Sequence, residues 1–245
     1  MRSANISAVG KSWLGALLGL LIVTQPLVAM AVQFKPPQRG IPGRREGGGT
    51  RDASACVQGN IRLTALLPET NLGLTTAEYP RFFWVMPKTR AKLVEFSLFE
   101  TDENLNDRTL VYKTSFAING NPGVASLTLP GRAMLPPLTV GRDYRWSVAL
   151  VCNPENRQRD VKVDGWVQRI APDASLNSQL AKANSTDRVR LYANNGIWFD
   201  TLTSLADLRC TRPKDTTLAK SWSELMRSVK LGAIAEQPFA QQCSK

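Results

Sequence analysis

The fold is decided by one stretch of the chain, Asp143-Tyr144-Arg145-Trp146-Ser147-Val148-Ala149-Leu150-Val151-Cys152. Large apolar side chains fall on every second residue, from Tyr144 to Cys152. Side chains of a strand alternate between its two faces, so this spacing predicts a strand with one buried face. Cys152 lies in phase with that face, which suits a disulfide inside the core.

The same period recurs on both sides of this stretch. With the turn residues between them, seven short strands favour an immunoglobulin-like antiparallel β-sandwich. Tyr144 also has the sequence position at which that fold bonds a tyrosine hydroxyl to upstream backbone. A phase shift at Gly165-Trp166 predicts a β-bulge in the last strand. The strands begin at Ile61, Phe82, Val94, Leu110, Ala125, Tyr144 and Val161.

After Pro172 the apolar period changes to that of a helix, and four short helices are predicted. Asp173 and Asp215 are capping residues, and Asn195-Gly196 is a good helix end. Strands followed by helices is the α+β order. Residues 191–202 resemble one hairpin of a tetratricopeptide repeat, although Thr201 replaces the family's small residue. One copy makes no array, so we expect a hairpin that packs on the sandwich.

The chain of 245 residues begins with the three parts of a secretory signal. Basic Arg2 and Lys11 precede an apolar run, and Ala29-Met30-Ala31 is a cleavage pattern. Thr24-Gln25-Pro26 interrupts the run before it is long enough to span a bilayer. We therefore expect an exported protein of the periplasm or cell surface that begins near Val32 and has no membrane span.

The composition divides the rest of the chain. Residues 32–55 are dense in Pro, Gly and charge, which predicts a linker that buries little. The expected organisation is a signal peptide at 1–31, a linker at 32–55, a β-sandwich domain at 56–171, a helical lobe at 172–235 and a coil tail at 236–245.

The four cysteines of an exported chain indicate disulfides, with three pairings open. We prefer Cys56–Cys152 and Cys210–Cys243, because each pair then stays within one structural half. A zinc site is the poorer alternative, since no cysteines have ligand spacing and the chain contains no histidine. No metal or other cofactor is expected.

The lack of histidine also excludes Ser-His-Asp and Cys-His mechanisms. Paired carboxylates remain as catalysts, for example in glycoside hydrolysis. The acidic residues available in loops and at strand ends read as solvated surface, so catalytic residues are not assigned. These residues are Glu69, Glu78, Glu95, Glu100, Asp102 and Glu103.

Positive charge raises the question of acidic partners. Removing the leader's two basic residues from the net charge of +11 leaves +9. The basic residues are scattered, and export disfavours nucleic acid, so solubility explains most of this charge.

The segment Gly43–Arg51 contains the best candidates for a partner or anion contact, Arg44, Arg45 and Arg51, because glycine amides beside arginines can hold an anion. It lacks the lysine and following helix of a phosphate-binding loop. Trp166 is the one tryptophan out of phase with its strand, which makes it a candidate for surface exposure.

Several segments together resemble the cyanobacterial family of domains of unknown function numbered 928. The resemblance covers nearly the whole mature chain and implies an exported cyanobacterial protein. It implies no activity and no catalytic residues. The segments are Arg39–Arg51, Leu63–Glu69, Tyr144–Trp146 with Cys152–Pro154, Gly165–Arg169, and Leu191–Ala193 through Gly196–Asp200.

Three functions are compatible with these observations. The first is a non-catalytic interaction protein of the envelope, whose partner is another envelope protein. The second is a carboxylate-dependent hydrolase of envelope polysaccharide or peptidoglycan. The third is a binder of anionic glycan or lipid headgroups, which requires basic residues gathered on one face.

Overall fold

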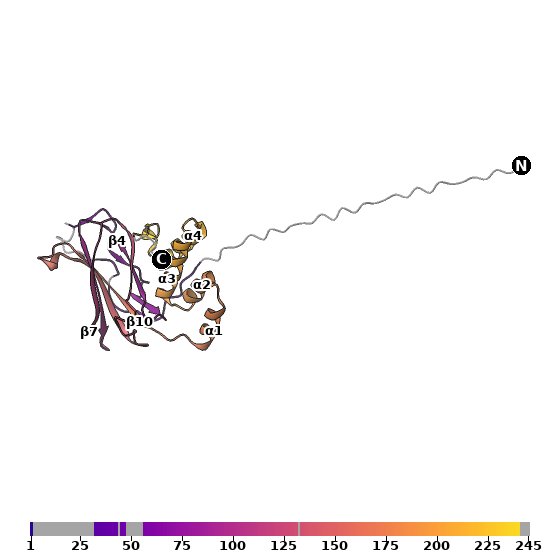
Figure 1. The fold of residues 1–245 in the computed structure, drawn as a ribbon, viewed down its shortest axis with the longest axis horizontal. Coiled ribbons are helices and arrows are strands. Elements are labelled where there is room, and N and C mark those ends of the chain that lie inside the picture. The colour runs from indigo at the N-terminus through magenta and orange to yellow at the C-terminus, as the bar shows by residue number, and fades with distance from the viewer. Residues whose placement is uncertain (2–31, 44, 48–55, 132, 241–245) are drawn as a thin grey trace. The chain divides into compact units, whose positions relative to one another are not determined.

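A computed structural model describes residues 1, 32–43, 45–47, 56–131 and 133–240. All the elements below belong to one compact unit, residues 31–245 (Figure 1). The signal peptide predicted at 1–31 lies outside the described residues, apart from Met1. Among the described residues, no helix is long and apolar enough to cross a membrane.

The larger sheet has five strands and contains the stretch from which the sequence analysis started. Its pairing is antiparallel except that β10 and β3 run parallel, so the expectation of a purely antiparallel sheet is wrong. β9 and β10 stay in unbroken register from Leu150↔Val161 to Asp143↔Gln168, so the bulge expected at Gly165 is absent from this pairing. The order is β3 (Leu72–Thr75), β10 (Val161–Arg169), β9 (Asp143–Val151), β6 (Leu93–Thr101) and β7 (Asp107–Ala117).

The smaller sheet is antiparallel and is extended at both edges by the ends of the described chain. Its strands are β2 (Thr64–Ala65), β4 (Arg81–Met86) and β8 (Gly123–Thr128). Glu46 bridges to Thr64 at one edge, and Phe239 bridges to Val124 at the other. The tail that we expected to be coil is therefore partly paired. Two further short strands, β1 (Val57–Gln58) and β5 (Lys88–Thr89), pair with each other.

One phenylalanine connects the layers. Phe82 of β4 is fully buried, and its ring centroid lies 5.1 Å from that of Phe96 and 5.2 Å from that of Trp146 in the larger sheet. Its third neighbour is Phe199 of the helical part, at 5.3 Å. Phe83 is buried as well, so both faces of β4 are covered. Sheets and helices therefore share one core in a mixed α+β fold.

Four helices follow the strands, as predicted: α1 (Ala174–Lys182), α2 (Ser185–Asn194), α3 (Trp198–Thr211) and α4 (Thr216–Ser228). The side chain of Asp173 accepts a hydrogen bond from Leu176 N, and that of Asp215 caps α4. Gly196 takes a positive φ of 71° at the end of α2, a conformation that suits glycine. Figure 1 shows the helices gathered on one side of the sheets.

Part of the segment predicted as a linker packs on the protein, which the expectation of a segment that buries little did not include. Val32, Phe34 and Ile41 are buried. The Phe34 ring lies 4.7 Å from Trp198, and Lys35 N donates to Ala193 O. A few apolar side chains, spaced among Pro and Gly, are enough to attach an extended segment to a core that already exists.

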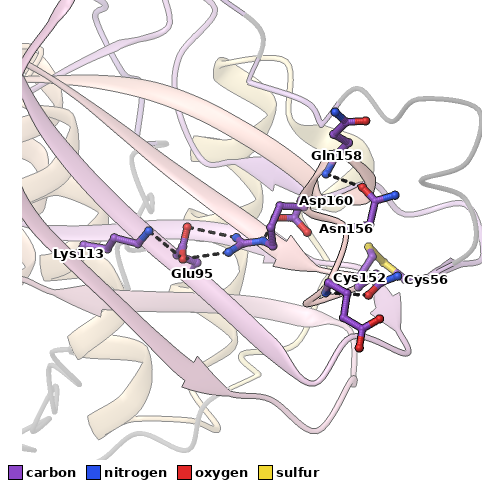
Figure 2. A network of polar contacts seen from close by, with 10 residues as sticks. Cys56, Glu95, Lys113, Cys152, Asn156, Gln158 and Asp160 are labelled. Carbon is purple, nitrogen blue, oxygen red and sulfur yellow. Dashed lines mark hydrogen bonds and ion pairs between the residues drawn. A yellow bond between two sulfur atoms is a disulfide. The ribbon is translucent and has the colours of Figure 1, made fainter.

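Two local expectations can be compared directly with the structure. Cys56 and Cys152 form a disulfide, with a Cα–Cα distance of 5.5 Å (Figure 2). Cys210 is also disulfide-bonded, and its preferred partner Cys243 lies outside the described residues. The hydroxyl of Tyr144 accepts a hydrogen bond from Thr139 N at 2.9 Å, which confirms the predicted bond to upstream backbone.

Gly73 provides a test of how closely α3 packs on β3. A Cβ at this position would lie 2.5 Å from Phe199 Cε2, inside a buried contact. We expect Gly73→Ala to lower the free energy of unfolding by ~1–3 kcal/mol, measured by chemical denaturation. Gly131→Ala is the control, because a Cβ there meets nothing within 4 Å. Equal effects of the two substitutions would contradict the packing described here.

Candidate binding site

The Gly-Arg segment is the stretch Gly43–Arg51 of the sequence analysis, and its described residues 45–47 lie beside β2. Ala65 N donates to Arg45 O, and Gly47 N donates to Leu63 O, each at 2.7 Å. Before this short pairing, Gly43 has a φ of 154° and passes directly over Asn71. A Cβ on Gly43 would lie 2.2 Å from Asn71 Nδ2, so only glycine allows this approach.

A surface hollow of about 360 Å³ opens at this place, and we refer to it as the Asn71 hollow. Its lining combines both signs of charge with one amide side chain. The lining residues are Gly43, Arg45, Glu46, Gly47, Arg62, Glu69 and Asn71.

Asn71 is the unusual member of this lining. It ends a turn, with its N donating to Pro68 O, and it holds a positive φ of 55°. The residue is only 3% exposed, yet neither its Nδ2 nor its Oδ1 has a hydrogen-bond partner among the described residues. Each such group costs ~1–3 kcal/mol when it is left unpaired. Buried polar groups are nearly always paired with the protein or with ordered water, so a water molecule or a ligand that reaches beneath Gly43 is the partner this amide can still take.

Arg45 is committed to holding the backbone. Its Nη1 donates to Leu67 O at 2.9 Å and to Val229 O, just beyond α4, at 2.7 Å. Burial lowers the pKa of this guanidinium, while the charges of Glu69 and Glu46 oppose that shift. Of the predicted anion contacts, Arg45 therefore lines the hollow mainly as a structural residue. Arg44 and Arg51 lie outside the described residues.

The other charged groups of the Asn71 hollow are open to solvent. The side chain of Arg62 is 71% exposed and lies 3.9 Å from Glu46 Oε2. Glu69 forms an exposed ion pair with Lys230 at 3.0 Å. Such exposed pairs contribute little to stability. These side chains can therefore exchange partners at little cost, so they are available to a ligand.

Trp166 is buried, so the expectation of surface exposure is wrong. It is out of phase because it points to the face of β10 opposite to Val163 and Val167. There it packs with Ile41 and Leu72 in a second, small apolar cluster and keeps 5% exposure. The sequence showed that Trp166 is out of phase with its strand. It did not show that Ile41, far earlier in the chain, packs over that face.

An adjacent hollow of about 500 Å³ lies next to Trp166 and also contains Arg145. Arg145 donates to Asp107 and to Asp164, and its guanidinium carbon lies 5.3 Å from the Phe99 ring centroid. The hydrogen bond to Asp107 raises the pKa of this guanidinium although burial opposes it. The positive charge of Arg145 is thus balanced by carboxylates of the protein itself.

Most of the acidic residues considered as catalysts form pairs on the surface. Glu95 contacts Arg157 at 3.2 Å and Lys113 at 3.1 Å, and Figure 2 shows the second contact. Burial raises the pKa of Glu95, but these two cations outweigh it and hold that pKa below its ordinary value. Glu78 contacts Arg169, and Glu100 contacts Arg142. Asp102 accepts a hydrogen bond within a local turn. Only Glu69 of this set lines the Asn71 hollow, where Glu46 joins it.

The sequence analysis missed Asp200, the most buried carboxyl group with a shifted pKa. It lies in the first turn of α3 and accepts hydrogen bonds from Thr75 Oγ1 at 2.7 Å and from Thr76 N at 3.2 Å. Burial raises the pKa of Asp200, against the effect of these hydrogen bonds. An aspartate early in a helix is ordinary in sequence, so no signal marked it. Its bonds join α3 to the end of β3.

Asp200 makes stability depend on pH in a defined direction. The folded protein keeps the proton at pH values where the unfolded chain, with a pKa of ~3.9, has lost it. The folded state then binds more protons, so this group lowers the free energy of unfolding as pH rises above ~4. We expect the free energy of unfolding of wild type, minus that of Asp200→Asn, to fall as the pH rises. The fall should be at most ~1.4 kcal/mol per pH unit.

Denaturation of both proteins at several pH values from 4 to 8 measures this difference. Glu95, whose pKa is lowered, contributes the opposite slope, but equally in both proteins, so it cancels. A constant difference over that range would show that burial does not raise the pKa of Asp200.

If Asn71 is kept for binding, its side chain should not raise the free energy of unfolding. We expect Asn71→Gly to leave the free energy of unfolding unchanged or to raise it by up to ~1 kcal/mol. Glycine suits the positive φ and removes both unpaired groups. Chemical denaturation measures the effect. A loss above ~2 kcal/mol would mean that the amide makes stabilising contacts within the protein.

Residues 46–239 match the family described as Domain of Unknown Function (DUF928), and the chain belongs to that family. The comparison with curated proteins finds no match.

Proposed function

We propose that this member of the DUF928 family is an exported, non-catalytic binding protein of the cyanobacterial envelope, and that the Asn71 hollow is its binding site. Export rests on the secretory signal pattern at residues 1–31, and the Cys56–Cys152 disulfide is consistent with an oxidising compartment. The periplasm and the cell surface both satisfy these observations.

One observation carries the binding role, namely the buried amide of Asn71, whose donor and acceptor are both unpaired beside an open hollow. A ligand that pairs with the amide would supply the hydrogen bonds that the folded protein leaves unmade. Exposed Arg62 and Glu69 at the same hollow add charged groups that can reorient towards it.

We propose an immunoglobulin-like sandwich as the framework for this site. Three features support it. Phe82 of the smaller sheet packs against Trp146 of the larger one, a disulfide holds Cys152 next to the core, and the Tyr144 hydroxyl bonds to upstream backbone. The parallel β3–β10 pairing is a departure from the usual antiparallel pattern of that fold.

A hydrolase is the second candidate, because Glu46 and Glu69 line the same hollow. Most enzymes that hydrolyse glycosides use a pair of carboxylates. A dedicated binder of anions has less support. The cations near the hollow are matched by carboxylates, and Arg45 is occupied by backbone carbonyls.

Ligand capture tests the binding role. The mature chain is immobilised, exposed to envelope extract of the native organism, washed and analysed by mass spectrometry for retained molecules. We expect wild type and Arg142→Gln, an exposed change outside the hollow, to retain the same ligand, and Asn71→Gly to lose at least nine tenths of it.

The same experiment separates the two candidates. A retained molecule of unchanged mass supports the binding role. Cleaved products that disappear with Glu69→Gln would support the hydrolase instead. Equal retention by wild type and Asn71→Gly would mean that the hollow is not the site.

A further inference from the structure

We infer that the Asn71 hollow takes one neutral sugar residue, a hexose-sized unit recognised through its hydroxyl groups. This inference rests on the proposed binding function and names the ligand class for the same site. It follows from the hydrogen-bonding groups of the lining, from their charge balance and from the size of the hollow.

The hydrogen-bonding groups require a ligand that both donates and accepts. Asn71 Nδ2 and the Arg62 guanidinium donate, so the ligand must offer acceptors. Asn71 Oδ1 and the carboxylates of Glu46 and Glu69 accept, so it must also offer donors. A hydroxyl does both, and a sugar ring has several hydroxyls at neighbouring positions.

The charge balance favours a neutral ligand. A carboxylate or phosphate group would face Glu46 and Glu69, while Arg45 already donates to Leu67 O and Val229 O. A cationic ligand would face Arg62 and the nearby ammonium group of Lys230. Either charge would therefore meet repulsion as well as attraction at the hollow, so a full charge on the ligand gains little there.

The size agrees with a single ring. The hollow of about 360 Å³ lies in the ~300–1,000 Å³ range of small-molecule sites, so one hexose ring fits in it with space left for water. A peptide group can also pair with the Asn71 amide. It offers only one donor and one acceptor, however, so once it is paired with the Asn71 amide it has no group left for Arg62, Glu46 or Glu69, which would keep their ion pairs and water.

Nuclear magnetic resonance of the side-chain amide of Asn71 tests this directly. The ¹⁵N-labelled mature chain is titrated separately with the methyl glycosides of glucose, galactose and mannose, with methyl glucuronide, and with N-acetylalanine methylamide. We expect saturable shifts of the Asn71 signals with at least one neutral glycoside. Arg62→Gln should weaken that binding at least tenfold, and Arg142→Gln should leave it unchanged.

The alternatives give different results. Shifts with the glucuronide alone, with the peptide probe alone, or with none of the probes would overturn the sugar assignment. If envelope extract still yields a ligand whose retention depends on Asn71, the binding function stands and only the ligand class is wrong. If retention does not depend on Asn71 either, both proposals fail.

Discussion

The packing of Phe82 is the contact on which the rest of the structure depends. Its ring meets Phe96 and Trp146 of the larger sheet and Phe199 of α3, so three layers converge on one side chain. Aromatic pairs add ~0.5–1.5 kcal/mol each beyond the burial of their surface. Because α3 is held here, Trp198 can donate its Nε1 to Leu66 O at 2.7 Å, and Phe34 can pack on the same indole. The N-terminal segment is therefore positioned by the core.

This attachment also creates the site. The segment arrives at the exposed edge of β2, where Glu46 bridges to Thr64, while Phe239 occupies the far edge beside Val124. Unpaired strand edges invite association with other chains, and here Glu46 and Phe239 each cover part of one edge of the smaller sheet. The cover at β2 is short, and Gly43 crosses above Asn71 instead of pairing with it. The hollow remains where that cover is incomplete.

The sequence predicted those parts of the fold that local patterns control. Alternation from Tyr144 to Cys152 predicted a central strand, and Asp173 and Asp215 predicted helix starts, because these signals depend on neighbouring residues. It failed for the three buried apolar residues of a segment whose composition indicated a linker. Burial of Val32, Phe34 and Ile41 depends on surfaces formed by residues far along the chain. Parallel pairing of β3 with β10 is likewise a tertiary outcome.

The candidate site was less predictable than the fold for the same physical reason. The Gly-Arg segment could be singled out, and its Arg45 does line the hollow. Arg45 nevertheless donates its hydrogen bonds to backbone carbonyls. Asn71, on which the proposed binding site rests, was not marked by any sequence pattern. An asparagine at a turn is ordinary when its amide reaches water. It becomes informative only when the fold buries it to 3% exposure without a partner.

Asp200 and Asn71 are two buried polar groups with different surroundings. Both are buried, but Asp200 receives hydrogen bonds from Thr75 and Thr76 that join α3 to β3 and partly offset its burial, although burial still outweighs them and raises the pKa of Asp200. Nothing in the described chain offsets the burial of the Asn71 amide. Natural proteins have only ~5–15 kcal/mol of net stability, so two unpaired groups at ~1–3 kcal/mol each are a substantial cost. Under the proposed binding function, a contact made only in the bound state would offset this cost at Asn71.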